Sequence, residues 1–230
     1  MVHEPGLLKP VISTRPPPRH PLPFITFAHS GKMQQPKNKA DSYRLIIIAA
    51  PSGAGKTSVT RHLLKAMPGQ LAFSVSCATR PPRHYEVDKV DYYFISADAF
   101  KDKIAHQAFV EWEMVYEGKY YGTLKSELQR IWLMNKSPLL DVDVKGGLNI
   151  QKQYPQQSLS LFIEPPSIEE LERRLKARGT ETSESLKARI SKASYELSFK
   201  DQFDHVIIND TLDRACKEAE TIVRQFLSPL

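Results

Sequence analysis

Eight consecutive residues constrain the fold of this chain more than any other segment: Ala50, Pro51, Ser52, Gly53, Ala54, Gly55, Lys56 and Thr57. The apolar run before them, Leu45 to Ala50, has the length and β-branched composition of a buried strand. The segment after them, Thr57 to Ala66, has a helical pattern and ends before Pro68. A glycine-rich turn between a strand and a helix, closed by Lys and Thr, is the pattern of a P-loop. It predicts an α/β fold that binds the phosphates of a nucleotide.

The chemistry of this turn depends on its backbone as much as on its side chains. Gly53 and Gly55 let the chain close around phosphate, and the N–H groups at the helix N-terminus supply positive potential. Lys56 is expected to reach the β- and γ-phosphates of ATP, and the Thr57 hydroxyl to ligate Mg²⁺. Ala50 stands where the pattern usually has its first glycine. The predicted ATP contacts are the eight residues of the turn together with Ser58.

The rest of the chain continues the alternation of strands and helices. Strands are predicted at residues 72–77, 92–95, 109–116, 119–121, 138–143, 158–163 and 205–208. Helices are predicted at 96–108, 123–134, from Ser167 onward with Glu170 completing a capping box, at 185–199 and at 211–227. This order is typical of a mainly parallel sheet with helices on both faces.

Length and charge suggest one domain with an extension before it. The chain has 230 residues and a net charge of +6. Residues 1–40 contain six basic residues, one acidic residue and eight prolines, so +5 of the charge lies there and +1 in the rest. The stretch shows no helical or strand period, and we expect a disordered, polyproline-like extension. It is either a leader without a function or the product of an over-long start, with Met33 as the true initiator.

These features also exclude function classes. No apolar run reaches the roughly 18 residues that span a bilayer, so no membrane partner is expected. The fold itself is nearly neutral, and the extension has no interleaved aromatic residues, so no nucleic-acid partner is expected either. Two cysteines form neither a disulfide framework nor a metal pattern, and a reducing cytoplasm is the default location.

A group of short motifs downstream of the P-loop indicates the second substrate. They are Ser74-Val-Ser76-Cys-Ala-Thr79-Arg80-Pro-Pro-Arg83, Phe109-Val-Glu111-Trp112, Tyr120-Tyr121-Gly122-Thr123, Leu140-Asp141-Val-Asp143, Arg174-Leu-Lys-Ala-Arg178-Gly-Thr-Glu181 and Asn209-Asp210. Together with the P-loop, in this order, they resemble the guanylate kinase family over about residues 43–227. The sequence departs from the family pattern at Lys145, where Gln is usual, and at Tyr85, where Gly is usual.

The resemblance implies a kinase that transfers the γ-phosphate of ATP to GMP, and to dGMP as a second acceptor. The residues it implies for GMP are Ser76, Arg80, Arg83, Tyr92, Glu111, Tyr121, Thr123 and Asp143. Among them, Tyr92 and Tyr121 would donate to the acceptor phosphate, Glu111 would accept from guanine N1–H and N2–H₂, and Asp143 would assist at N2. Ser76 and Thr123 fall where the family contacts the O6 side of the base. The resemblance also implies a contact of Asn209 with ATP.

Elementary chemistry agrees with two of these roles. Two arginines three residues apart in a loop suit a dianionic phosphate, because planar guanidinium groups bind its oxygens bidentately. A carboxylate accepts from both donors of the guanine edge, whereas adenine presents a lone pair at N1 and would be repelled. Without the resemblance, Glu111 would be interpreted as an exposed strand acid and either arginine as solvated surface.

The remaining residues of the predicted catalytic group belong to a lid. Lys56, Arg80, Arg174, Arg178 and Arg189 are the predicted catalytic residues, and the last three are implied by the resemblance. The charge pattern alone, with acidic neighbours at residues 169, 170, 172 and 184, favours a solvated helix face. Asp141 is a weak candidate for a metal ligand. The predicted organisation is a core (41–73, 125–163 and 191–230), a nucleoside-monophosphate-binding part (74–124) and a lid (164–190).

Three interpretations compete with this one. A P-loop also occurs in kinases of other phosphorylated small molecules, such as a phosphorylated sugar, and Glu111 argues against that class. A catalytically inactive guanylate-kinase-like module that binds proteins would lack the phosphate lysine, and Lys56 is present. A nucleic-acid-binding tail has only the charge of residues 1–40 in its favour. The oligomeric state is expected to be a monomer or a homodimer.

Overall fold

The computed structural model describes residues 43–84, 86–177 and 183–228, which all belong to one compact unit, Gln35–Leu230. The predicted extension at residues 1–40, Tyr85 and the predicted lid residue Arg178 lie outside the described residues.

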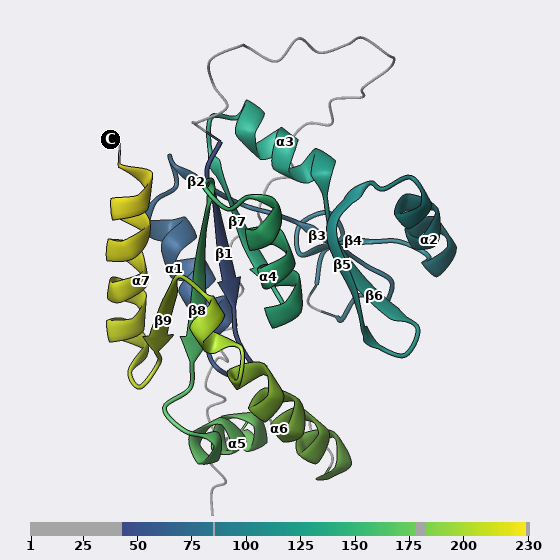
Figure 1. Ribbon diagram of the computed structural model, residues 1–230. Helices are drawn as coiled ribbons and strands as arrows, with labels where there is room; N and C mark the ends of the chain where they lie inside the picture. The colour runs from purple at the N-terminus through teal and green to yellow at the C-terminus, as the bar shows by residue number, and fades with distance from the viewer. Residues whose placement is uncertain (1–42, 85, 178–182, 229–230) are drawn as a thin grey trace, which may run out of the picture. The chain divides into compact units, whose positions relative to one another are not determined.

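A parallel sheet forms the centre of the described fold (Figure 1). Its five strands lie in the order β2-β7-β1-β8-β9, and every neighbouring pair is parallel. The strands are β1 (Leu45–Ala49), β2 (Leu71–Phe73), β7 (Ser137–Val142), β8 (Ser158–Glu164) and β9 (His205–Ile208). The α/β fold class predicted from the alternation of elements is therefore confirmed.

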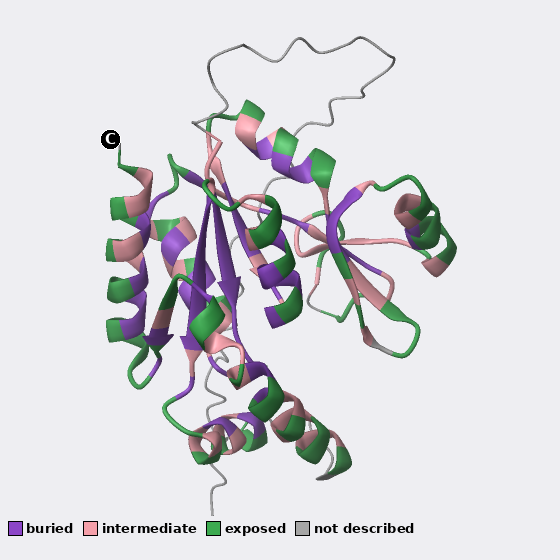
Figure 2. Ribbon diagram, viewed as in Figure 1, coloured by how far each residue is buried: buried purple, intermediate pink, exposed green. Residues whose placement is uncertain are grey.

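Helices cover both faces because the strands are apolar on both faces. Ile46 and Ile48 of β1 belong to a core cluster that includes residues of α1 (Lys56–Ala66) and α7 (Leu212–Leu227). Leu45 and Ile47 belong to a second cluster with residues of α3 (Lys125–Leu133) and α4 (Val144–Gln153). Every residue of β1 is fully buried, and the sheet interior is correspondingly purple in Figure 2. The turn after β1 is thus attached to a strand that the core encloses on both sides.

A second sheet lies between β2 and α3 in the chain. It has the order β4-β3-β6-β5, with β3 (Ser76–Ala78), β4 (Tyr92–Phe94), β5 (Phe109–Tyr116) and β6 (Lys119–Leu124). Helix α2 (Ala97–Ala105) packs on it, and the rings of Phe100 and Phe109 stack at 4.3 Å. Ser96 caps this helix as predicted, since its hydroxyl accepts from Ala99 N.

Two further helices, α5 (Ile168–Ala177) and α6 (Ser183–Leu197), follow β8, and a short 3₁₀ turn (Lys200–Gln202) leads to β9. Ser167 accepts from Glu170 N, which is half of the predicted capping box. The other half does not form, because the Glu170 carboxylate binds Arg173 and Arg174. No helix in the described residues combines the length and apolarity that crossing a bilayer requires.

The structure corrects three predictions about elements. The single strand predicted at 72–77 is two strands in different sheets, because Ser74 and Val75 bond to Leu139 O and the Glu127 carboxylate instead of to one ladder. The helix predicted from residue 123 begins at Lys125, because Thr123 and Leu124 extend β6. Helix α4 was not predicted. It contains the pair Gly146–Gly147, and glycine inside a helix weakens the sequence pattern.

The crossing from the first sheet to the second is held by one buried carboxylate. Glu127 of α3 is 3% exposed. Its carboxylate accepts from Val75 N at 3.0 Å, from the Tyr93 hydroxyl at 3.1 Å and from two nitrogens of Arg130 at 2.7 and 2.9 Å. These bonds connect α3 with the chain between β2 and β3 and with β4. Glu127 therefore fixes the second sheet at the point where the chain enters and leaves it.

Replacing Glu127 with Ala should lower the free energy of unfolding by about 2 kcal/mol, because the buried Val75 N–H loses its acceptor. Urea denaturation monitored by circular dichroism measures the change. Gln129 is exposed on the same helix, and Gln129→Ala should stay within about 0.5 kcal/mol of the parent. Equal stability of the Glu127→Ala variant and the parent would contradict this role.

Candidate active site

The turn between β1 and α1 has the geometry of a phosphate-binding loop. Gly53 and Gly55 have φ angles of 97° and 103°, which non-glycine residues rarely adopt. Gly55 has a second reason to lack a side chain, because a Cβ there would lie 2.1 Å from Asn209 Nδ2. That amide donates to Ala54 O at 2.7 Å. Asn209 is buried behind the loop and braces it.

Lys56 is the first residue of helix α1 and forms an ion pair with Asp141 of the neighbouring strand β7. Its Nζ lies 2.7 Å from Asp141 Oδ1 and donates to Val142 O at 2.6 Å. Burial disfavours the charged ammonium, but the charge and hydrogen bond of Asp141 outweigh it and leave the pKa of Lys56 above its ordinary value. Lys56 is therefore a cation at neutral pH, held beside the predicted phosphate site.

An open cleft of about 320 Å³ joins the P-loop to the second sheet. Its lining includes most of the predicted site: Ala50, Pro51, Ser52, Gly53, Gly55, Lys56, Thr57, Ser76, Arg80, Arg83, Tyr92, Glu111, Tyr121, Asp141, Asp143 and Arg189. The structure thus brings together residues that are far apart in the sequence. The predicted residues that the structure describes outside this lining are Ala54, Ser58, Thr123, Arg174 and Asn209.

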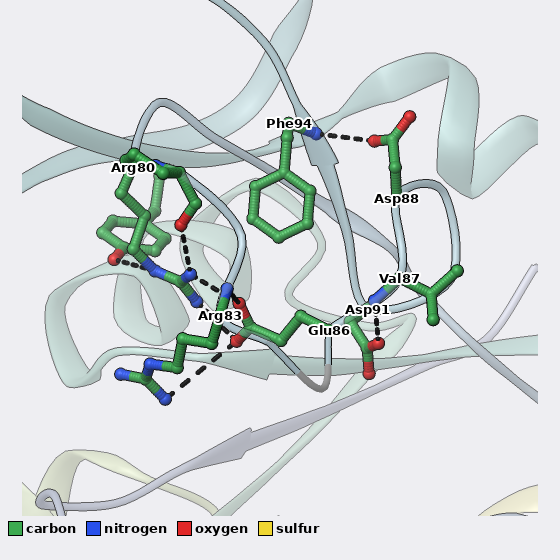
Figure 3. Close-up of polar contacts among 9 residues, drawn as sticks. Arg80, Arg83, Glu86, Val87, Asp88, Asp91 and Phe94 are labelled. Atoms are coloured by element: carbon green, nitrogen blue, oxygen red, sulfur yellow. Dashed lines mark hydrogen bonds and ion pairs between the residues drawn. The ribbon is translucent and has the colours of Figure 1, made fainter.

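The loop between β3 and β4 presents its arginine in a fixed orientation (Figure 3). Arg80 donates to both Glu86 carboxylate oxygens, at 2.6 and 2.7 Å, and to the Tyr121 hydroxyl at 3.0 Å. The same Glu86 carboxylate accepts from Arg83 N at 2.8 Å. The hydrogen bonds from Arg80 hold the pKa of Glu86 below its usual range. Glu86 therefore holds the Arg80 side chain and the Arg83 backbone while remaining ionised.

Glu86 supports the candidate site through Arg80, and sequence reasoning gave it no role. Its side chain is 6% exposed and lies between the two arginines, whereas the Arg83 side chain is 58% exposed. The Arg80 guanidinium also lies 5.1 Å from the centre of the Tyr92 ring. The spacing of Glu86 from Arg80 and Arg83 was the available signal, but a loop does not specify which side chains meet.

Glu111 lines the same cleft and is 9% exposed. Its Oε1 accepts from the Thr123 hydroxyl at 2.8 Å, and Ser76 Oγ lies 3.4 Å from Thr123 Oγ1. Burial raises the pKa of Glu111 to about 7, and nearby Asp143 adds to the effect. Thr123 was predicted to contact GMP, but it is fully buried and does not line the cleft. Its hydroxyl contacts Glu111 instead. Glu111 is not an exposed strand acid.

Asp143 follows β7 and caps helix α4. Its Oδ1 accepts from Gly146 N at 2.7 Å, which directs the carboxylate to the helix N-terminus and fixes its position. Asp143 and Glu111 come from different elements and line the same cleft. Two carboxylates that converge on one cavity form a surface of acceptors, which suits a ligand edge made of N–H donors.

The predicted lid residues occupy different places. Arg189 of α6 lines the cleft and donates to the Ser52 hydroxyl of the P-loop at 2.8 Å. Arg174 of α5 is partly buried, donates to the Glu170 carboxylate at 2.8 Å and to Asn209 O at 2.9 Å, and does not line the cleft. Arg189 thus contacts the P-loop directly, and Arg174 contacts Asn209, which in turn donates to Ala54 O of the P-loop.

Sequence reasoning also missed one buried acid in the cleft. Glu196 of α6 is 8% exposed and lines the cleft beside Lys192, whose Nζ lies 3.5 Å from it. Burial raises the pKa of Glu196 above its usual value. Its position in a polar helix gave no signal, because only the packing of α6 against the cleft distinguishes it from Glu184, the exposed acid of the same helix.

Comparison with known proteins identifies the family. A family model described as guanylate kinase matches residues 42–226. The guanylate kinase of Bacteroides fragilis is 47% identical over 190 residues, which are 83% of this chain and 93% of that protein. That of Salinibacter ruber is 45% identical over 185 residues, or 80% and 97% of the two chains. The crystal structure of guanylate kinase from Anaplasma phagocytophilum covers 81% of this chain and 87% of its own, with a TM-score of 0.66 and 26% identity. The chain belongs to the guanylate kinase family of nucleotide-binding P-loop kinases.

Proposed function

We propose that this protein transfers the γ-phosphate of ATP to GMP, and also to dGMP, giving ADP and GDP or dGDP. The observation that supports this most directly is the cleft that contains both the P-loop lysine and the buried carboxylate of Glu111. A phosphate donor site and a guanine-selective acceptor site in one cavity are what this reaction requires.

The acceptor phosphate is bound by the loop that contains Arg80. Glu86 and Tyr121 hold the Arg80 guanidinium before substrate arrives, so little side-chain entropy is lost on binding. Arg83 and the hydroxyls of Tyr92 and Tyr121 complete the phosphate contacts. A dianionic phosphate then meets two guanidinium groups, which bind it through charge-assisted hydrogen bonds.

The base is selected at the other end of the cleft. The ionised Glu111 accepts from guanine N1–H and N2–H₂, and Asp143 accepts the second N2 hydrogen. Ser76 and Thr123 orient the Glu111 carboxylate through the hydroxyl chain that ends on its Oε1. Adenine would place a lone pair against this carboxylate, which disfavours AMP.

The transfer itself is a direct displacement. An oxygen of the GMP phosphate forms a bond to the γ-phosphorus of ATP while the bond to the bridging oxygen of ADP breaks. Lys56 leaves Asp141 for the β- and γ-phosphates and, with Arg80, Arg174, Arg178 and Arg189, stabilises the charge that develops. The protein contributes position and electrostatic stabilisation, so no covalent enzyme intermediate forms.

The residues at the P-loop fit a magnesium ion that arrives with ATP. Thr57 and Asp141 both line the cleft beside Lys56. The described residues contain no group of three His, Cys, Asp or Glu side chains able to hold a metal by themselves. The Thr57 hydroxyl and the Asp141 carboxylate suit Mg²⁺, which commonly takes one or two protein ligands and completes its shell with phosphate oxygens and water. When bound, the ion would neutralise charge on the β- and γ-phosphates, with Thr57 as ligand and Asp141 as the weaker candidate.

The architecture supports a division of labour. We propose that residues 74–124 bind the nucleoside monophosphate, that residues 164–190 act as a lid over ATP, and that the remaining parts from 41 onward form the core. Lid closure would exclude water, which otherwise would hydrolyse ATP. We propose a cytoplasmic monomer or homodimer that acts on ATP and GMP and has neither nucleic-acid nor membrane partners.

An acceptor screen tests the proposal. ADP release should be fastest with GMP and dGMP and slow with AMP, UMP and ribose phosphates. Glu111→Gln should lower kcat/KM for GMP about 10- to 150-fold, because one charge-assisted hydrogen bond is lost and a donor faces a donor. AMP should lose less or improve, because the amide can donate to adenine N1.

Glu117→Gln makes the same chemical change on the exposed turn between β5 and β6 and serves as the control for Glu111→Gln. It should leave both efficiencies unchanged. An equal loss for GMP and AMP in Glu111→Gln would show that Glu111 supports the fold and does not select the base.

Lys56→Met should reduce turnover with GMP by about 10²- to 10⁴-fold, because the ammonium group that stabilises the transferring phosphoryl group is lost. Lys65 is exposed at the end of the same helix, and Lys65→Met is the matched control. Turnover of Lys56→Met within threefold of the parent would contradict the assignment of the P-loop.

The efficiency with GMP should fall as the pH drops below about 7, because protonated Glu111 no longer accepts both guanine hydrogen bonds. The GMP phosphate itself titrates at about pH 6 and would also change the efficiency. The measurement is therefore the ratio of kcat/KM between the parent and Glu111→Gln, in which the effect of the phosphate cancels. This ratio should rise from pH 6 to pH 8. A constant ratio would show that ionisation of Glu111 does not affect GMP use.

A further inference from the structure

We propose that Gly146 is a specificity-determining positioning residue, whose missing side chain allows Glu111 and Asp143 to converge on the guanine edge. The inference rests on the proposed function, because it concerns the same base site. Gly146 is buried in the first turn of α4, and its amide donates to Asp143 Oδ1. It has no side chain to contact a ligand, so it would act through the two acids.

The space that Gly146 leaves free is occupied by the two carboxylates. A Cβ at this position would lie 2.8 Å from Asp143 Oδ1 and 2.8 Å from Glu111 Oε2. It would also lie 3.3 Å from Glu111 Cδ. Real Cβ atoms are essentially never found under 3.0 Å from another heavy atom. An alanine here therefore forces at least one of the acids to move.

Neither backbone conformation nor core packing explains the glycine. Gly146 is not among the glycines with positive φ, so an L-residue can adopt its backbone conformation. Glycine in a helix is also less stable than alanine, so local propensity favours the substitution. The neighbouring Gly147 has a different environment, because its Cβ would meet Ile47, Phe203 and Ala49 of the core at 3.2 to 3.5 Å. Within one turn of α4, Gly146 therefore faces the two acids of the site and Gly147 faces the apolar core.

Movement of the acids would change their function more than it would change the fold. Both atoms that a Cβ on Gly146 would approach most closely are the ends of side chains, which can rotate away. Each carboxylate is nevertheless held, Glu111 by Thr123 and Asp143 by Gly146 N. Displacing either breaks one of these bonds and misaligns the acceptors for guanine N1–H and N2–H₂. Base selection should therefore be lost while the core remains intact.

Gly146→Ala tests this, with Gly147→Ala as the matched control. For GMP, Gly146→Ala should lower kcat/KM by about 10- to 100-fold, mainly through KM, while KM for ATP stays within twofold. The preference for GMP over IMP, which lacks the N2 amino group, should also shrink, but by a smaller factor, because IMP keeps N1–H and loses that contact as well. Gly147→Ala should keep the parent's preference even if it changes the melting temperature. A parent protein that does not phosphorylate GMP would refute the proposed function, independently of Gly146.

A second variant keeps the test decisive if Gly146→Ala folds poorly. Glu111→Asp shortens the acid by one methylene and withdraws it from the space that the new methyl group would fill. In the double variant, the melting temperature lost by Gly146→Ala should return in part, and the losses in GMP efficiency should be less than additive. Additive losses, or an unchanged GMP-to-IMP preference in folded Gly146→Ala, would overturn the proposal.

Discussion

The ion pair between Lys56 and Asp141 joins the two strand ends on which the site depends. Lys56 follows β1 through the P-loop, and Asp141 lies in β7, paired in parallel register with Ile48 of β1. Because β1 is completely buried, the loop after it cannot shift without disturbing the core. The P-loop, Asp141 and Asp143 are therefore fixed relative to one another before any substrate binds. This is the usual place for a ligand in a parallel α/β sheet, at the carboxyl ends of its strands.

Two further cations of the predicted site are also paired with carboxylates. Arg80 is held by Glu86, and Arg174 by Glu170, as Lys56 is held by Asp141. Each of these cations, all proposed to meet phosphate, thus has a carboxylate partner in the free protein. Such pairing keeps these side chains oriented in partly buried positions. Phosphate must compete with these carboxylates, which favours ligands that present several charges at once, as ATP and a nucleoside monophosphate do.

The second sheet adds a different kind of chemistry to this scaffold. Glu127 connects the second sheet to α3 where the chain crosses between the sheets. The strands of the second sheet place Glu111, Ser76 and Tyr121 at the cleft. Glu111 is buried and accepts from the Thr123 hydroxyl, and burial nevertheless raises the pKa of this carboxyl. A carboxylate in such a position is destabilised until a ligand supplies N–H donors, so the proposed selection of guanine would also relieve the electrostatic cost of burying Glu111. Gly146 contributes by what it lacks, because the two acids occupy the space of its side chain.

The sequence by itself determined the fold class and indicated most of the residues that line the candidate site. A local pattern suffices for the P-loop, because a strand, a glycine-rich turn and a helix in succession specify it through short-range geometry. The ordered motifs around Arg80, Glu111 and Asp143 indicated the family, and the family match agrees with them. Only the tertiary structure decided how these residues act. That Thr123 and Asn209 support other groups from behind the cleft, that Glu86 holds Arg80, and that Gly146 makes room for two acids all depend on contacts that no local pattern specifies. Such contacts leave no periodicity, because packing and burial arise only when the two sheets and the helices between them come together.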